Sequence, residues 1–375
     1  MRKPVLLVGD APDREVLVQK APYLGLEAVC LAGTPPADAL WAAARENGAQ
    51  GVLALNETVR AAVREVARTL NLPGEDTAPD FAEWDQLAAG GMAVAEHRLV
   101  RDETEAHAAA ETLGTPVWVR PAALGGAPFC MRVDDAEDVS LAFAKVHRQD
   151  AKAPVLVQRP VAGTACRLVG FKLRRDFHAI ETISERMRDS PYCVPEKLVL
   201  PWDIPDKHYQ QAVDVAHKVA RRLPSGWYPL ELGFIATDDG PVLVHMHAPV
   251  RFEPALAALL YHAEAIDLDA DLLRVAAGEQ PSETPRRFLG ACAAWLPVRT
   301  GVVMSVRGRD AAAALPGVQA VHVAANVGDH IGHTVDRATR DTSGYVIATG
   351  GRRADALRNA EAAIAKIAIE TSPAA

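Results

Sequence analysis

The first seventy residues alternate between short apolar runs and longer amphipathic stretches, and this alternation constrains the fold more than any other feature. A strand–helix–strand–helix order with short connections predicts a parallel sheet that is covered on both faces by helices. No Gly-x-Gly-x-x-Gly follows the first strand, where Gly9 stands alone, so this lobe is expected to be scaffold or a substrate wall rather than a dinucleotide site. The predicted strands are 5–8, 28–31 and 51–55, and the predicted helices are 13–24, 37–47 and 57–70.

The pattern changes after a polar link at residues 75–79, and the strands that follow are predicted to be antiparallel. The clearest local pattern is a hairpin with arms at 229–236 and 241–247, joined by Thr237-Asp238-Asp239-Gly240. Glycine-marked turns and a closing helix at 354–369 form a further unit. The prediction is an α/β chain with an α+β centre in three domains: a doubly wound lobe at 1–79, a central region at 80–285 and a small C-terminal α+β module at 286–375.

Composition excludes several classes of protein. The net charge of −8 gives no basic footprint, so neither nucleic acid nor an anionic membrane face is an expected partner. Apolar runs fall short of the roughly 18 residues that span a bilayer, and the N-terminal apolar stretch is too short for a signal peptide. The five cysteines are scattered without a Cys-x-x-Cys pair, which favours packed thiols in a reducing cytoplasm over zinc or a disulfide framework.

A strand at 116–120 delivers a cation, Arg120, to a glycine-rich turn that contains Gly125 and Gly126. Backbone amides of such a turn can cover phosphate oxygens while a cation at the strand end neutralises them. A structural Gly-Gly hairpin is the alternative interpretation. A second buried strand ends in Gln158-Arg159-Pro160, where a polar pair can meet the edge of an adenine ring.

The predicted hairpin carries Glu231 on one arm and His245 and His247 on the other. Strand alternation places both histidines on the same face, where Glu231 can meet them. A carboxylate with two imidazoles is a plausible metal set, and histidine ligands favour Zn, Mn, Fe or Ni over Mg. The charged run 185–189 is interpreted as solvated, self-paired loop charge, with the mouth of a cleft as the alternative.

Taken together, the order of these features resembles the ATP-grasp superfamily, and within it the ADP-forming L-amino-acid ligases, over essentially the whole chain. The resemblance implies an ATP-grasp fold, ATP and a divalent metal such as Mg or Mn as cofactors, and small carboxylate and amine substrates, expected to be amino acids. It also implies an acyl-phosphate intermediate, release of ADP and phosphate, and a possible homodimer. Site roles carried over are phosphate contacts for Arg120, Gly125 and Gly126, adenine contacts for Gln158, Arg159 and Pro160, and a metal carboxylate for Glu231.

The chain departs from that family in its second metal motif, usually Glu-x-Asn-x-Arg, which here is His245-Met246-His247-Ala248-Pro249. Two imidazoles replace the hard oxygen ligands that Mg²⁺ prefers. Arg251 is a candidate substitute for the missing catalytic arginine, and Glu253 for the missing carboxylate. Three hypotheses stay open: an active ligase, a degenerate ATP-grasp protein that acts as a binding or partner subunit, and a transition-metal site at His245 and His247 with other chemistry.

Overall fold

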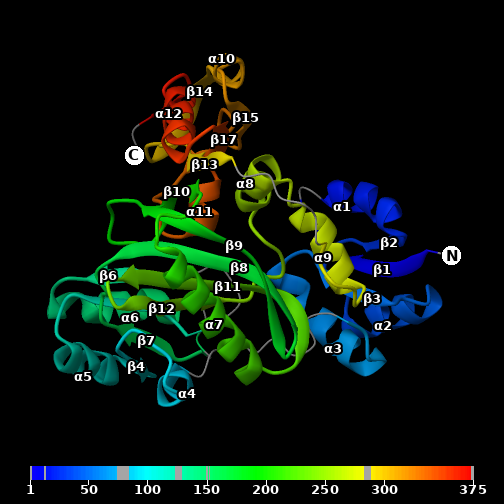
Figure 1. The fold of residues 1–375 in the computed structure, drawn as a ribbon, viewed down its shortest axis with the longest axis horizontal. Helices are drawn as coiled ribbons and strands as arrows, with labels where there is room; N and C mark the ends of the chain where they lie inside the picture. Colours follow the sequence, from blue (N-terminus) through cyan, green and yellow to red (C-terminus); the bar gives the residue numbers. More distant parts are fainter. Residues whose placement is uncertain are drawn as a thin grey trace.

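The computed structural model describes residues 2–11, 14–73, 84–122, 129–148, 151, 153–282 and 289–372. Three regions follow one another along the chain (Figure 1). Among the described residues, no helix is both long and apolar enough to cross a bilayer.

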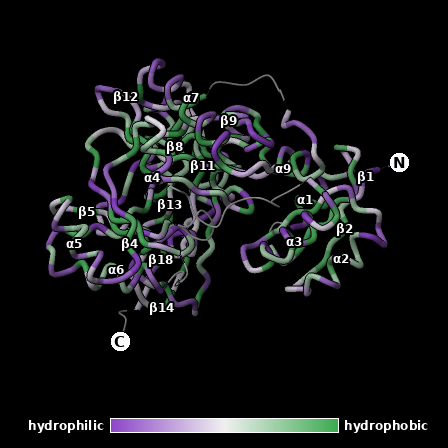
Figure 2. Tube along the Cα trace, turned by 90° about the horizontal axis from the view of Figure 1, so that it is seen from below, coloured by the Kyte–Doolittle hydropathy of each residue, from purple (hydrophilic) through white to green (hydrophobic). Residues whose placement is uncertain are grey.

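The N-terminal lobe is the predicted parallel sheet, with strand order β2-β1-β3. One face packs on α2 and α3, and the other on α1 and on α9 from the central region, so helices cover both faces as expected. Figure 2 shows this lobe beside the rest of the chain, with α9 at the junction. Its elements are β1 Lys3–Val8, α1 Arg14–Lys20, η1 Ala21–Leu24, β2 Leu26–Leu31, α2 Ala37–Glu46, β3 Gly51–Ala54, η2 Glu57–Val59 and α3 Arg60–Leu70.

A small antiparallel sheet of order β4-β7-β5-β6 follows, packed on α5 and α6. Its apolar core is made by alternating strand residues such as Val117, Val119, Val155 and Val157, each at most 1% exposed. The elements are α4 Trp84–Ala89, β4 His97–Val100, α5 Glu103–Leu113, β5 Val117–Pro121, β6 Met131–Val133, η3 Ala136–Asp138, α6 Val139–His147 and β7 Val155–Gln158.

A large sheet of order β12-β11-β8-β9-β10-β13-β17-β15 forms the middle of the molecule. The predicted hairpin is present, closed by the Thr237 hydroxyl donating to the Gly240 carbonyl at 2.9 Å. The central elements are β8 Thr164–Arg174, β9 Asp176–Met187, β10 Pro195–Leu200, α7 Asp206–Arg222, β11 Gly226–Thr237, β12 Gly240–His247, α8 Pro254–Glu264 and α9 Leu268–Ala276.

The C-terminal region continues the same sheet, because β13 pairs with β10 in antiparallel register. The predicted closing helix at 354–369 is wrong at its end: α12 stops at Ile364, and β18 pairs with β14, with Ile369 opposite Val306. The elements are β13 Gly290–Trp295, β14 Gly301–Arg307, α10 Arg309–Ala313, β15 Val318–Val323, β16 His330–Ile331, α11 Arg337–Asp341, β17 Gly344–Gly350, α12 Arg353–Ile364 and β18 Ala368–Thr371.

Candidate functional site

A cavity of about 200 Å³ lies between the small sheet and the large sheet. The small sheet contributes Arg120 from β5 and Gln158 from β7, and the hairpin contributes His245 from β12. Arg337 reaches the same cavity from α11 of the C-terminal region. Side chains that are far apart in the sequence therefore converge on one cleft.

Arg120 stands at the cavity end of β5, with its guanidinium 5.3 Å from the centre of the Trp84 ring. Its Nη1 lies 3.1 Å from His245 Nδ1. A guanidinium has no acceptor, so Nδ1 of His245 must accept this bond, and the imidazole is neutral with its hydrogen on Nε2. Burial, then the charges of Arg120 and Arg337, hold the pKa of His245 well below its ordinary value.

Gly233 makes room for His245 on the neighbouring strand. The two residues are opposite each other in the β11–β12 register, and a Cβ atom at position 233 would lie 2.9 Å from His245 Cβ. A glycine in the strand interior is a mark of such close approach.

Three buried nitrogen atoms on this side of the cleft lack a hydrogen-bond partner in the part of the chain that the structure describes: Arg120 Nη2, Gln158 Nε2 and His245 Nε2. All three belong to residues that line the cavity, and each is a donor. We call Arg120, Gln158 and His245 the donor side. Leaving a buried donor unpaired costs about 1–3 kcal/mol, so three of them facing one cavity indicate a ligand that carries acceptors.

The other predicted nucleotide contacts are placed differently. The Arg159 side chain turns to the end of α5, where Nε donates to the Leu113 carbonyl at 3.0 Å, while its backbone N–H donates to Glu96. Arg159 still lines the cavity, whereas Pro160 and Arg251 are not among the described lining residues. Gly125 and Gly126 lie outside the described residues.

The hairpin brings Glu231 and His247 together as predicted, because they are register partners with His247 Nδ1 3.6 Å from Glu231 Oε2. The rings of His245 and His247 stack with their centres 6.1 Å apart, which places both on one face. Glu231 is 1% exposed and lies behind the cavity wall.

Glu231 does not stand alone, because two guanidinium groups already contact the same oxygen. Its Oε2 accepts from Arg167 Nη1 at 3.0 Å and from Arg337 Nη1 at 2.8 Å. Arg167 also donates to Glu253 at 2.8 Å and pairs with Glu185 at 2.9 Å. We call these residues, with Arg340, the arginine–carboxylate cluster: Arg167, Glu185, Glu231, Glu253, Arg337 and Arg340.

The charges in this cluster hold one another in the ionised state. Burial alone would raise the pKa of Glu253, but Arg167, Arg340 and Arg337 outweigh it and lower that pKa to about 2. The pKa of Glu231 also lies well below its ordinary value, with burial opposed by Arg167 and Arg337. The pKa of Arg167 is raised for the same reason, since three glutamates outweigh its desolvation.

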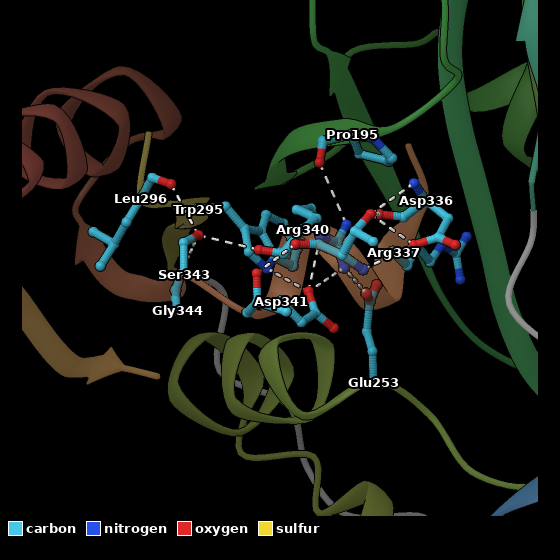
Figure 3. A network of polar contacts seen from close by, with 12 residues as sticks. Pro195, Glu253, Trp295, Leu296, Asp336, Arg337, Arg340, Asp341, Ser343 and Gly344 are labelled. Carbon is cyan, nitrogen blue, oxygen red and sulfur yellow. Dashed lines mark hydrogen bonds and ion pairs between the residues drawn. The ribbon is translucent and has the colours of Figure 1, made fainter. Parts of the chain in front are cut away.

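The short helix α11 carries Arg337 and Arg340, and Figure 3 shows the contacts of Arg340 with Glu253 and with the Pro195 carbonyl that anchor it. Arg340 Nη2 lies 2.5 Å from Glu253 Oε2, and its guanidinium is 3.5 Å from the centre of the Trp295 ring. At the other end of α11, the Asp336 side chain accepts from the Thr339 backbone N–H at 2.8 Å and so caps the helix. These contacts fix the direction in which Arg337 points.

The predicted metal set of Glu231, His245 and His247 does not fit a divalent ion in this arrangement. Glu231 Oε2 is taken by two guanidinium groups, and His245 Nδ1 is taken by Arg120. Among the described residues, no three His, Cys, Asp or Glu side chains lie close enough together to hold an ion. The sequence pattern placed the right residues together but did not reveal the arginines that occupy the space between them.

Sequence reasoning missed Arg167, Glu185 and Arg337 as site residues. Arg167 is 1% exposed inside the apolar run Cys166-Arg167-Leu168-Val169, and a charge in such a run requires a buried partner. Glu185 is one such buried partner of Arg167, because its side chain is 8% exposed and lines the cavity. The interpretation of Glu185 as solvated loop charge is therefore wrong. Nothing in the local sequence distinguishes Arg337.

Comparisons with known proteins agree with this architecture. Residues 294–372 match the family model for L-amino acid ligase C-terminal domain 2. The uncharacterized protein y4rH of Sinorhizobium fredii is 28% identical over 336 residues, which are 86% of this chain and 68% of that protein.

Two solved structures superpose over nearly the full length. The L-amino acid ligase from Bacillus licheniformis gives a TM-score of 0.80 at 14% identity, with 99% of each chain covered. The N5-carboxyaminoimidazole synthase from Aspergillus clavatus, in complex with ADP and 5-aminoimidazole ribonucleotide, gives 0.72 at 15% identity, with 97% of this chain and 98% of that chain covered. The chain therefore has the ATP-grasp fold, as its sequence predicted, and its residues 294–372 match the C-terminal domain 2 of L-amino acid ligases.

Proposed function

We propose that the chain is an ATP-dependent carboxylate–amine ligase that acts on amino acids through an acyl phosphate. The observation that carries the proposal is the set of three unpartnered donors, Arg120 Nη2, Gln158 Nε2 and His245 Nε2, in one cavity between the two sheets. A nucleoside triphosphate supplies acceptors at both ends, on its base and on its phosphates. The similarity to solved ligases, one of which holds ADP, supports the same assignment.

The charge of the cavity favours an anion. Its described lining includes four arginines and one glutamate; Arg159, Arg167 and Arg337 are paired with carboxylates, whereas Arg120 has no carboxylate partner among the described residues. Apolar side chains, among them Val161, Phe234 and Ile235, line the same cavity and suit the faces of a purine base. In this assignment Gln158 meets the edge of the base, and Arg120 and His245 meet the phosphates.

The reaction proposed for this cleft has two steps. A carboxylate oxygen of one amino acid attacks the γ-phosphorus, the bond from that phosphorus to the β-bridging oxygen breaks, and ADP leaves. The amine of the second amino acid then attacks the acyl carbon, an amide bond forms, a proton is lost from the nitrogen, and inorganic phosphate leaves. Catalysis of this kind depends on positioning and charge stabilisation. Arg120 and Arg337 stabilise the developing negative charge, and neutral His245 donates from Nε2.

A second candidate is a nucleotide-binding subunit that has lost phosphoryl transfer. The observation in its favour is the arginine pairing of Glu231, the carboxylate that the family resemblance assigns to metal. This hypothesis shares the nucleotide site with the ligase hypothesis and differs from it only in turnover.

One assay separates the two. The purified protein is mixed with ATP and pooled amino acids, with and without divalent metal, and ADP, phosphate and dipeptides are quantified alongside nucleotide binding. ADP release that requires amino acids and yields a dipeptide supports the ligase. Binding without ADP release in every metal condition supports the binding subunit and rejects the ligase for those substrates. No binding of ATP rejects both.

A matched pair of variants assigns any activity to this cleft. Arg120→Met removes the cavity arginine that has no carboxylate partner among the described residues, whereas Arg132→Met removes a β6 side chain that is 42% exposed and paired with Asp134. Activity is expected to fall only in Arg120→Met. Equal loss in both variants, or in neither, would place the reaction elsewhere.

A further inference from the structure

Two of the three residues predicted to bind metal, the carboxylate of Glu231 and the imidazole of His245, are already bonded to cations within the protein. Glu231 Oε2 accepts two bonds from Arg167 and Arg337, and His245 Nδ1 accepts from Arg120. A divalent ion on that oxygen would have to displace a guanidinium or lie in direct contact with two of them. Both arrangements are opposed by like-charge repulsion in a site with little water.

The histidine that stands in place of glutamate in the second motif also disfavours a divalent ion at this site. A glutamate at position 245 would repel a triphosphate unless a bridging cation lay between them. Neutral His245 instead presents an unpartnered Nε2–H to the cavity, and that group can donate directly to a phosphate oxygen. With histidine at position 245, no cation is needed to separate a protein carboxylate from the triphosphate at this point.

Arg337 is positioned to supply positive charge where an ion would otherwise do so. It lines the cavity, and its Nη1 bond to Glu231 and the anchoring of α11 by Arg340 fix its place. Arg167 is 1% exposed and is held by three carboxylates, so its guanidinium is equally fixed. Preorganised cations of this kind are the usual alternative to a metal for holding phosphate charge.

We propose that the nucleotide this cleft binds is the metal-free triphosphate, with Arg120 and Arg337 in the electrostatic role that the ATP-grasp pattern gives to divalent ions. The inference rests on the proposed function, since it presumes that the cleft binds a nucleoside triphosphate. It differs from that function in stating the chemical species recognised: free ATP rather than its magnesium complex.

Isothermal titration of the full chain with a non-hydrolysable ATP analogue tests the inference. Titrations are run in EDTA and in excess Mg²⁺ or Mn²⁺. Because metal withdraws the free nucleotide from solution, the apparent affinity is expected to fall by about ten-fold or more when excess metal is added. Binding that requires metal, or that tightens with it, overturns the inference and leaves the proposed function standing. Binding in neither condition overturns both.

Arg337→Gln sharpens the test, with Arg132→Gln as its matched control on an exposed site. Metal-free affinity is expected to fall by about ten-fold or more in Arg337→Gln and to stay unchanged in the control. Unchanged affinity in Arg337→Gln would overturn the assignment of Arg337. Thermal unfolding of each variant shows whether it is folded.

A second variant keeps the inference falsifiable if Arg337→Gln does not fold. The double substitution His245→Glu with His247→Asn restores the Glu-x-Asn pattern and leaves the six residues of the arginine–carboxylate cluster unsubstituted. It is expected to weaken binding in EDTA and to shift the preference toward Mg²⁺, because a new carboxylate then faces the phosphates. The same metal preference as in the parent chain would overturn the role assigned to His245.

Discussion

The donor side and the arginine–carboxylate cluster lie on one cleft and are both buried, yet their polar groups are paired to different extents. On the donor side, Arg120, Gln158 and His245 each keep an unpartnered nitrogen among the described residues. In the cluster, every carboxylate lies within 3.0 Å of at least one guanidinium nitrogen and forms an ion pair with it. Burial and charge alone therefore do not identify a ligand site; the state of the hydrogen bonds does.

The difference predicts that changes in the cluster reduce stability, whereas changes on the donor side reduce only nucleotide binding. Removing one partner from a buried, satisfied ion pair leaves an uncompensated charge and is strongly destabilising. Removing an unpartnered donor relieves a desolvation cost in the free protein and weakens only the complex. The two regions can therefore be separated by measuring stability and affinity on the same variants.

The largest effect is expected for Arg167→Met, which leaves Glu185, Glu231 and Glu253 without their shared partner. The unfolding free energy should fall by about 4 kcal/mol, measured by urea denaturation followed by circular dichroism. Arg186→Met is the control, because Arg186 is 53% exposed and 4.0 Å from Asp203. Its change should stay within about 0.5 kcal/mol. Similar losses in the two variants would show that the cluster adds no stability.

Acid should weaken the cluster over a defined range of pH. The pKa of Glu253 is about 2 in the folded chain against an ordinary value of 4.5, so its contribution is fully present above pH 4.5 and is lost as the pH falls toward 2. The loss should amount to about 3 kcal/mol, with Glu231 adding to it in the same direction.

Unfolding free energies measured across that range check this prediction. The slope between pH 4.5 and 2 should be shallower in Glu253→Gln than in the parent chain, because the amide does not titrate. Parallel slopes in the two proteins would contradict the assignment to Glu253.

On the donor side, Arg120→Met should reduce nucleotide affinity by about 30-fold, equivalent to about 2 kcal/mol, with little change in stability. The reason is the loss of a charge-assisted bond to phosphate, together with the bond that orients His245. Isothermal titration gives the affinity, and Arg132→Met is the control. A fall in stability as large as that of Arg167→Met would remove the distinction between the two regions.

The smallest effect is expected for Gln158→Leu, which should lower nucleotide affinity but raise the stability of the free protein. Affinity should fall by about five-fold because one hydrogen bond to the base is lost, while the free protein should gain slightly in stability because the unpartnered amide is gone. Thermal unfolding with and without nucleotide measures both. A free protein that loses stability would mean that Gln158 has a structural partner.

Much of the fold could be predicted from local sequence. Strand and helix periodicity identified the parallel lobe, and the turn Thr237–Gly240 identified the hairpin. The helix α5 was missed although Asp102 caps it and Gly114 follows it, because its face consists mainly of small alanines with weak periodicity. The strand β18 was absorbed into the preceding helix, since four residues whose partner strand lies at 301–307 carry little local information.

The site could be predicted only as far as its residues lie on neighbouring strands. Alternation and hairpin register bring Glu231, His245 and His247 together, and both are local properties. Arg337 lies 106 residues after its partner Glu231 in the sequence. Arg340 lies 87 residues after its partner Glu253. No pattern along the chain encodes such a pairing, so the contacts of these arginines with Glu231 and Glu253 were visible only in three dimensions.

The position of α11 has a consequence for biosynthesis. Until a nascent chain has emerged as far as residue 340, Glu231 and Glu253 lack the guanidinium groups of Arg337 and Arg340. A chain that ends before α11 would bury these carboxylates without their counter-charges. It would therefore fold poorly and be degraded readily by proteases. The cleft therefore acquires its complete charge pattern late in translation.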